Sequence, residues 1–317
     1  MPSPSSWHGT GSGASGTPST SSATAWTRRT HFRRASSGPS GPSEPGTNAT
    51  AGARRIASAF ARARDDGRAA LIPYVVAGYP DGDTGLAAAL AAADAGADLL
   101  EVGLPYSDPL ADGATLQRAS AAALAAGATL ERSLRLIERI GAARPGLPLV
   151  PMAYANQVLG GGDGEAVAKR LAGAGAAGVI VADLTPDEGA PFEAVARRVG
   201  LAVVYLVAPT TPPARMARVA ARSGGFLYCV SLVGVTGART SLPTSVGRLV
   251  RQVRAVSPVP VAVGFGVSRP AHVRAIARAG ADGVIVASAL VDALGADGHD
   301  VDAMARLVGT LRDATAR

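Results

Sequence analysis

The stretch RAGADGVIVAS (278–288) carries the pattern that decides the fold of this chain. It joins a helix end, a glycine-containing turn and the continuous apolar run GVIVAS. Glycine suits this turn because many helices end in a left-handed backbone conformation that glycine adopts without a steric penalty. The run does not alternate polar and apolar residues, which is typical of a strand buried on both faces of a parallel sheet.

The same unit of helix end, turn and buried strand recurs at ADAGADLLEVG (93–103), AGAGAAGVIVAD (172–183) and ARSGGFLYCVS (221–231). Between such runs lie stretches with apolar residues at helical spacing, such as LERSLRLIERIGAA (130–143). Eight βα units predict an α/β protein with a closed (β/α)8 TIM barrel. A doubly wound open sheet is the alternative, which the absence of a GxGxxG loop after a strand disfavours. The eight runs are LIPYVVAG (71–78), DLLEVGL (98–104), PLVPMAY (148–154), GVIVADL (178–184), LAVVYLV (201–207), GFLYCVS (225–231), VPVAVGFG (259–266) and DGVIVAS (282–288).

Residues 1–52 differ from the rest in composition. They are rich in Ser, Gly, Thr and Pro and show no hydrophobic periodicity. Such a segment cannot bury enough apolar surface to offset the entropy cost of ordering it. We therefore expect a disordered, basic extension at 1–52 and a catalytic barrel at 53–317. An Arg- and Ser-rich start also resembles an organelle transit peptide, but the arginines form no amphipathic pattern, which favours an extension without function.

The net charge of +7 belongs largely to that extension. Residues 1–55 hold six arginines and one acid, Glu44, which leaves 25 basic and 23 acidic residues after position 55. No basic stripe is interleaved with aromatic residues, so we expect no nucleic-acid partner. No apolar run reaches the ~18 residues of a membrane span, so we expect a cytoplasmic protein. The single cysteine, Cys229, lies in the apolar run FLYCV and is interpreted as core packing.

In such barrels the active site lies at the C-terminal ends of the strands. Glu101 follows Leu99 and Leu100 in a strand that is otherwise apolar. Loss of solvent there would raise the pKa of its carboxyl group and suit it to exchange protons near neutral pH. The alternative is a structural glutamate that pairs with a neighbouring arginine.

The loop after this strand contains Asp108 and Asp112, with Pro105 and Pro109 to stiffen it. A carboxylate held opposite Glu101 could stabilise positive charge that develops on a substrate. Both aspartates could instead cap turns or the next helix. The sequence of the loop leaves both readings open.

Glycines after the last three strands indicate a phosphate site. Gly237, Gly264 and Gly266 would let backbone N–H groups approach an anion. Ser288, at the start of a short helix, would add a hydroxyl group and the positive end of a helix dipole. Loops after strands seven and eight are the usual phosphate site of these barrels.

The residues that are missing narrow the chemistry further. Lys169 is the only lysine and lies in a helical segment, so a Schiff-base mechanism has no suitable amine. The four histidines, at 8, 31, 272 and 299, are not at strand ends, and no metal-ligand spacing occurs. Cofactor-free acid–base chemistry on a small phosphorylated substrate is the remaining class, with no metal.

The stretch LEVGLPYSDPLADG (100–113) resembles the signature of tryptophan synthase alpha chains. The resemblance covers roughly residues 55–315 and implies retro-aldol cleavage of indole-3-glycerol phosphate to indole and glyceraldehyde 3-phosphate, in tryptophan biosynthesis. Further motifs agree in order: IPYVVAGYP (72–80), MAYANQV (152–158), VADLTPDE (181–188), GVTGAR (234–239) and GFGVS (264–268).

The resemblance also implies the roles of individual residues. Glu101 would protonate the indole ring carbon and remove the proton from the side-chain hydroxyl group, and Asp112 would bind the indole N–H. Three positions depart from the usual family residues: Ala287 replaces a glycine, Ala114 a proline and Leu232 an arginine. The implied substrate-binding residues are Tyr74, Met152, Tyr154, Tyr228 and Thr236, and the implied phosphate-binding residues are Gly237, Gly264, Phe265, Gly266 and Ser288.

Finally, the resemblance implies an alpha2beta2 heterotetramer with a tryptophan synthase beta chain. Pyridoxal phosphate would be bound only by that beta chain, and this chain would need no cofactor. The shared surface would include the Tyr106–Asp108 loop and the loop after the sixth strand. The alternative function is a catalytically weak or inactive alpha-like module that binds and activates the beta chain, which the presence of both Glu101 and Asp112 disfavours.

Overall fold

A computed structural model describes residues 50–160, 162–230, 245–264 and 266–317. The residues expected at Thr236, Gly237 and Phe265, and residues 1–49 of the expected extension, lie outside this part of the chain. Within the described residues, nine strands form one parallel sheet in the order β5-β4-β3-β2-β1-β9-β8-β7-β6. The strands are β1 Ala70–Val76, β2 Leu100–Gly103, β3 Leu149–Ala153, β4 Gly178–Val181, β5 Ala202–Val204, β6 Leu206–Val207, β7 Leu227–Val230, β8 Val261–Gly264 and β9 Gly283–Val286.

The sheet closes on itself because its two terminal strands, β5 and β6, are separated along the chain only by Tyr205. The backbone N–H of Tyr205 donates to the hydroxyl oxygen of Ser223 at 3.0 Å. Its carbonyl oxygen still accepts the backbone N–H of Tyr228 at 3.0 Å. The eight expected strands are therefore confirmed as a (β/α)8 barrel, in which the fifth is interrupted at one residue.

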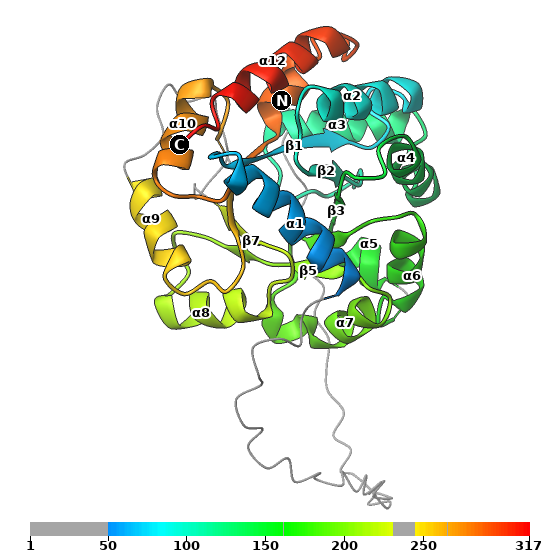
Figure 1. Ribbon diagram of the computed structural model, residues 1–317. Coiled ribbons are helices and arrows are strands. Elements are labelled where there is room, and N and C mark those ends of the chain that lie inside the picture. The colour runs from blue at the N-terminus through cyan, green and yellow to red at the C-terminus, as the bar shows by residue number, and fades with distance from the viewer. Residues whose placement is uncertain (1–49, 161, 231–244, 265) are drawn as a thin grey trace, which may run out of the picture. The chain divides into compact units, whose positions relative to one another are not determined.

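Helices surround the barrel (Figure 1). The expected helix at 130–143 is α4, and it begins there because the Thr129 side chain accepts the backbone N–H of Arg132 at 3.2 Å. The remaining helices around the sheet are α2 Gly82–Asp94, α3 Ala114–Ala125, α5 Ala155–Leu159, α6 Glu165–Gly173, α7 Pro186–Arg198, α8 Pro213–Arg222, α9 Ser245–Arg254, α10 Pro270–Arg278, α11 Ser288–Ala293 and α12 Val301–Asp313.

Helix α1 (Ala51–Asp65) crosses the end of the barrel at which the strands begin (Figure 1). Its buried Ile56 and Phe60 belong to the same apolar cluster as the side chains inside the barrel. The helix approaches closely at Gly52, where an added methyl group would lie 1.7 Å from the carbonyl oxygen of Ala177. Since α1 starts at Ala51, the boundary expected between residues 52 and 53 falls inside this helix.

An ion pair is buried at the same end of the barrel. The Arg68 guanidinium group donates to the two carboxylate oxygens of Asp98 at 2.6 and 2.8 Å. The backbone N–H of Leu71 donates to the same carboxylate at 2.8 Å. The Arg68 and Asp98 side chains are only 9% and 11% exposed. Asp98, which lies two residues before β2, is therefore well satisfied in the folded chain.

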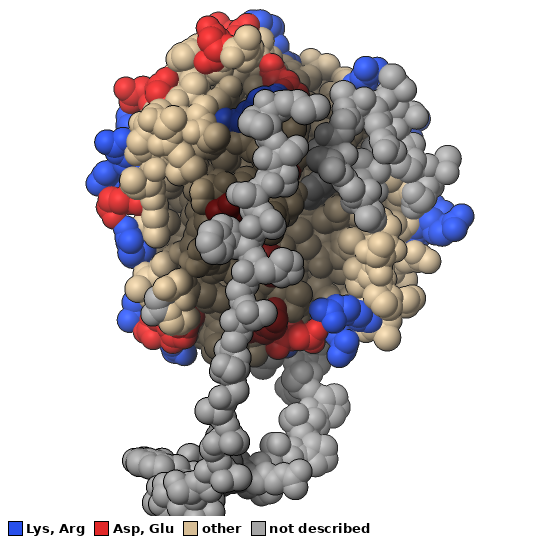
Figure 2. Space-filling view, turned by 180° about the vertical axis from the view of Figure 1, so that it is seen from behind, with Lys and Arg blue, Asp and Glu red and all other residues tan. Residues whose placement is uncertain are grey.

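The opposite face is hollowed at its centre, and basic and acidic side chains mix around its rim (Figure 2).

Lys169 lies on α6, in agreement with the helical segment expected for it, and its ammonium group pairs with Glu165 at 2.7 Å. In the described ranges, no helix is both long and apolar enough to cross a membrane.

Candidate active site

Glu101 lies on β2 and faces the inside of the barrel, whereas its neighbours Leu100 and Val102 pack toward the outer helices. Its side chain is buried, with 1% of the residue exposed. This burial raises the pKa of Glu101 to about 8, and the negative charge of Asp112 adds to the shift. No hydrogen-bond partner for its Oε2 atom occurs in the described part of the chain. The geometry therefore differs from that of a structural glutamate paired with an arginine.

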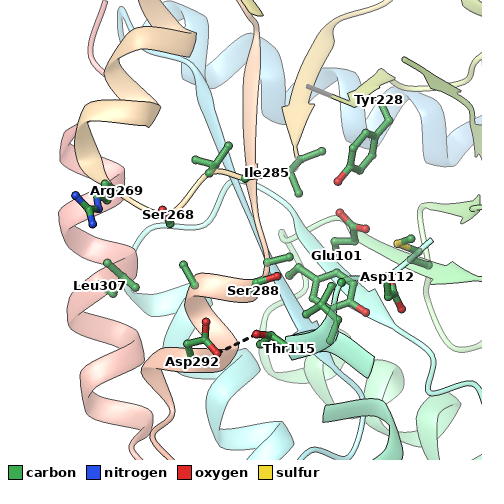
Figure 3. A pocket seen from close by; sticks show the side chains of 18 residues that line it. Glu101, Asp112, Thr115, Tyr228, Ser268, Arg269, Ile285, Ser288, Asp292 and Leu307 are labelled. Carbon is green, nitrogen blue, oxygen red and sulfur yellow. Dashed lines mark hydrogen bonds between the residues drawn. The ribbon is translucent and has the colours of Figure 1, made fainter. Parts of the chain in front are cut away.

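Asp112 lies in the loop between β2 and α3. Burial raises the pKa of its carboxyl group to about 6, while a hydrogen bond from the Tyr154 hydroxyl group acts in the opposite direction. The N-cap of α3 is Gly113, without a side-chain cap, so Asp112 does not cap this helix. Instead its side chain faces the same cavity as Glu101 (Figure 3).

Asp108, the second aspartate of this loop, has a different environment. It is exposed, and its carboxylate accepts a hydrogen bond from the Ser107 hydroxyl group at 2.7 Å. It is not part of the cavity wall. The structure thus separates two aspartates that the sequence leaves equivalent.

Tyr154 ties the Asp112 loop to the end of β3. Its hydroxyl oxygen accepts the backbone N–H of Ala111 at 3.1 Å, and its ring stacks on that of Tyr106 with centroids 5.1 Å apart. The Gln157 amide donates to the carbonyl oxygen of Pro105 at 2.9 Å. Tyr154 therefore acts on the cavity through Asp112, since it is not itself part of the cavity wall.

Glu101 and Asp112 face a cavity of about 360 Å³ at the C-terminal ends of the strands. Figure 3 shows the Tyr228 hydroxyl group directed toward Glu101. A mainly apolar wall around two carboxyl groups suits a largely hydrophobic substrate that carries a few polar groups. The lining residues expected from the sequence are Tyr74, Glu101, Asp112, Met152, Tyr228, Gly266 and Ser288, and Ala287 lies beside them.

Two glycines make room for the tyrosines of this wall. A methyl group on Gly103 would lie 1.8 Å from the Tyr74 hydroxyl oxygen, and one on Gly264 would lie 2.3 Å from that of Tyr228. Gly264, which the sequence associates with phosphate, is not part of the cavity wall itself. Burial holds the pKa of both tyrosines well above the ordinary value, so their hydroxyl groups stay protonated.

The cavity extends from the carboxyl groups to Gly266 and Ser288. Gly266 has φ of +74°, a conformation that favours glycine. Ser288 is the first residue of α11, and Ala287 before it has φ of −120°, which does not require glycine. This end of the cavity therefore brings together Gly266 and Ser288, which the sequence associates with phosphate.

Sequence reasoning missed several residues of this wall. Arg269 directly follows the GFGVS motif, a position that could have indicated it, and it supplies a side-chain cation. Asp292 accepts a hydrogen bond from the Thr115 hydroxyl group at 3.2 Å, which links α11 to α3 (Figure 3). No motif marks Thr115, Leu116, Asp292 or Leu307, because helix packing brings them to the cavity.

Other sequence-based candidates lie away from this cavity. Cys229 is buried in the core, where burial raises the pKa of its thiol to about 12. Among the described residues, no group of three or more His, Cys, Asp or Glu side chains could hold a metal ion. The side chains that offer proton chemistry in the cavity are thus chiefly Glu101 and Asp112.

Fold and site together define a (β/α)8-barrel enzyme with two carboxyl groups at the C-terminal ends of its strands, that of Glu101 buried and that of Asp112 partly buried. The family model described as Tryptophan synthase alpha chain matches residues 60–315, and the chain belongs to this family.

Individual relatives agree with the family match. The tryptophan synthase alpha chain of Roseiflexus castenholzii is 48% identical over 240 residues, which cover 76% of this chain and 91% of the relative. That of Methanothermobacter thermautotrophicus is 42% identical over 267 residues, which cover 83% and 98%. A structure of Mycobacterium tuberculosis tryptophan synthase has a TM-score of 0.77 and 42% identity, and the match covers 83% of this chain and 98% of that chain.

Proposed function

We propose that this chain is a carbon–carbon lyase that cleaves indole-3-glycerol phosphate to indole and glyceraldehyde 3-phosphate, with Glu101 and Asp112 as its catalytic residues. Membership of the tryptophan synthase alpha chain family supports the reaction. The observation that carries the assignment of residues is the pair of carboxyl groups in one cavity, one buried and one partly buried, whose pKa values are raised to about 8 and about 6. Near pH 7 this pair contains one acid and one carboxylate, as a proton-transfer mechanism needs.

Glu101 starts the reaction as the acid. Its carboxyl group donates a proton to the indole ring carbon that bears the glycerol phosphate side chain, which makes the ring cationic. The resulting carboxylate then takes the proton of the adjacent side-chain hydroxyl group. The carbon–carbon bond breaks, its electron pair returns to the ring, and the oxygen becomes the aldehyde of glyceraldehyde 3-phosphate. Glu101 ends the cycle protonated, so one side chain serves as both acid and base.

Asp112 stabilises the intermediate. Its carboxylate accepts the indole N–H, where positive charge collects once the ring is protonated, and a negative group nearby lowers the energy of that cation. The Tyr154 hydroxyl group holds the aspartate in place by a hydrogen bond, and it is itself fixed to the loop because it accepts the backbone N–H of Ala111. The rings of Tyr74 and Tyr228 form the wall beside the indole.

The other end of the cavity fits the phosphate group. Backbone near Gly266 and the start of α11 at Ser288 offer N–H and hydroxyl donors, and Arg269 adds positive charge at the rim. The proton transfers need only side-chain carboxyl groups, so we propose that this chain uses no cofactor of its own. Pyridoxal phosphate is assigned to the beta chain alone.

We further propose that a beta chain binds beside the Asp112 loop, in an alpha2beta2 complex. Leu110, two residues before Asp112, is 94% exposed although it is a large apolar residue. Covering this side chain with a partner would remove its apolar surface from water, which favours association. A partner that covers Leu110 would also restrict the loop that carries Asp112. The cytoplasmic location, and an extension at 1–52 without catalytic function, stay predictions from the sequence.

The decisive experiment measures indole release from indole-3-glycerol phosphate by the purified full chain, with and without a beta chain. We expect release by the chain alone and faster release in the complex. No release under either condition, together with faster turnover by the added beta chain, would favour the alternative of an activating module.

A further inference from the structure

The imidazole of His272 is a buried group that the chemistry above does not use. His272 is the third residue of α10, and 3% of it is exposed. Its Nε2 atom has no hydrogen-bond partner in the described part of the chain. A buried polar atom without a partner is unfavourable. A leucine of similar volume would avoid this cost, so stability alone does not account for a histidine here.

The other ring nitrogen has a definite contact. The backbone N–H of Ser268 donates to Nδ1 of His272 at 3.3 Å. A nitrogen that accepts a hydrogen bond carries no proton, so the neutral ring must hold its proton on Nε2. The Nε2–H, which has no partner among the described residues, is thus a consequence of using Nδ1 as an acceptor for the turn before α10.

This turn forms part of the cavity wall. Gly266, Val267 and Ser268 all line the end of the cavity that also contains Ser288. Arg269, the N-cap of α10, makes no side-chain cap hydrogen bond, and Pro270 after it has no N–H group. His272 therefore takes over the restraint of this turn from within the helix, and it does so beside the space assigned to the phosphate.

We propose that His272 is a positioning residue for the anionic end of the substrate. It holds the Ser268 backbone through Nδ1 and so keeps the Gly266–Ser268 turn in the shape that binds phosphate. This inference rests on the proposed function, because it takes the cavity beyond Glu101 as the phosphate site.

Three variants separate this role from packing. His272→Leu keeps the volume and removes the acceptor. His272→Asn places a carbonyl oxygen near the position of Nδ1 and should restore the contact. Ile276→Val perturbs the buried face of the same helix without touching the turn. Each is compared with the parent by kcat and KM for indole-3-glycerol phosphate, by affinity for inorganic phosphate from its protection against thermal unfolding, and by inhibition by indole.

We expect His272→Leu to raise KM about fivefold, with kcat within about twofold of the parent and phosphate affinity weakened by the same factor as KM. Its melting temperature should change little, because the loss of the Ser268 N–H acceptor is offset by the removal of an Nε2–H that has no partner among the described residues. Inhibition by indole, which has no phosphate, should not change. His272→Asn and Ile276→Val should resemble the parent in KM.

The inference is overturned if His272→Leu leaves KM and phosphate affinity unchanged, or if Asn fails to restore them. It is also overturned if indole inhibition weakens as much as phosphate binding. Failure of the proposed function gives a different result: the parent binds phosphate but releases no indole. In that case the phosphate affinities of the variants still decide the role of His272. A parent that binds no phosphate contradicts the inference directly.

Discussion

Asp98 and Glu101 are three residues apart along the chain but lie at opposite ends of the barrel, and their carboxyl groups are treated in opposite ways. Asp98 accepts hydrogen bonds from Arg68 and from the Leu71 backbone. Glu101 is at least as buried, yet it has no cationic partner and its Oε2 is unpaired among the described residues. The first arrangement stabilises the charge, and the second makes the charge costly.

The difference shows that the carboxyl group at the N-terminal end of the barrel contributes to stability, whereas the one at the C-terminal end reduces stability in favour of catalysis. A buried carboxylate that keeps its partners costs the folded state much less than one left without them. A buried carboxyl group without a counter-ion destabilises the fold at high pH and gains a pKa suited to catalysis. Variants at the N-terminal end of the barrel are therefore expected to change the free energy of unfolding, and variants at the C-terminal end to change activity.

The largest expected effect is on catalysis at the C-terminal end. Glu101→Gln keeps the shape of the side chain and removes the proton that is exchanged. It should lower kcat at least ~10²-fold, measured by indole release at saturating indole-3-glycerol phosphate. Turnover near that of the parent would contradict the assigned role.

At the N-terminal end, the matched change is Asp98→Ala. It leaves Arg68 buried without its partner, and we expect a loss of about 3 kcal/mol in the free energy of unfolding. Urea denaturation measures this loss, while kcat per folded molecule should stay near that of the parent. Asp66→Ala is the control, because this second partner of Arg68 has a side chain that is 59% exposed and should contribute less than about 1 kcal/mol. Equal losses from both variants would remove the contrast between buried and exposed pairs.

The next effect in size concerns the pH dependence of kcat/KM and the part that Asp112 plays in it. The carboxylate form of Asp112, with a pKa of about 6, and the acid form of Glu101, with a pKa of about 8, are both needed. The value of kcat/KM should therefore rise with pH through about 6 and fall above about 8. Asp112→Asn should lower kcat at least ~tenfold and remove the rise near pH 6. A change in KM alone, with both limbs kept, would indicate a structural role instead.

A last expected effect is a gain in stability at high pH. The pKa of Glu101 is raised from its ordinary 4.5 to about 8, so the unfolded chain loses this proton at a lower pH than the folded chain. The parent therefore loses stability as pH rises from about 4.5 to about 8, and Glu101→Gln has no such loss. The variant should melt a few degrees higher at pH 8, with the gap closing toward pH 4.5. Thermal melts across this range check it, and a gap independent of pH would argue against the raised pKa.

Much of the barrel could be predicted because buried parallel strands leave continuous apolar runs, and each expected run overlaps an observed strand. The break at Tyr205 could not, since LAVVYLV is apolar throughout and the break depends on a hydroxyl group from Ser223. Glu101 was recognisable as a charge in an apolar strand.

The pattern of the loop did not separate Asp112 from Asp108, because both fit a turn. The family resemblance indicated Asp112, and only the structure shows that Asp112 faces the cavity and Asp108 does not. Gly264 shows a further limit: glycine in a GFG motif indicates close approach, but the pattern does not say that the approaching group is the ring of Tyr228.

The helix that crosses the beginning of the strands also determines how substrate enters the cavity and how products leave it. Ile56 and Phe60 of α1 fill that end of the barrel. The cavity is therefore closed there and opens at the C-terminal ends of the strands. Substrate and both products must then pass through the same opening. An enzyme that receives indole without releasing it to solvent has to bind at the C-terminal ends of the strands, and not at the end covered by α1.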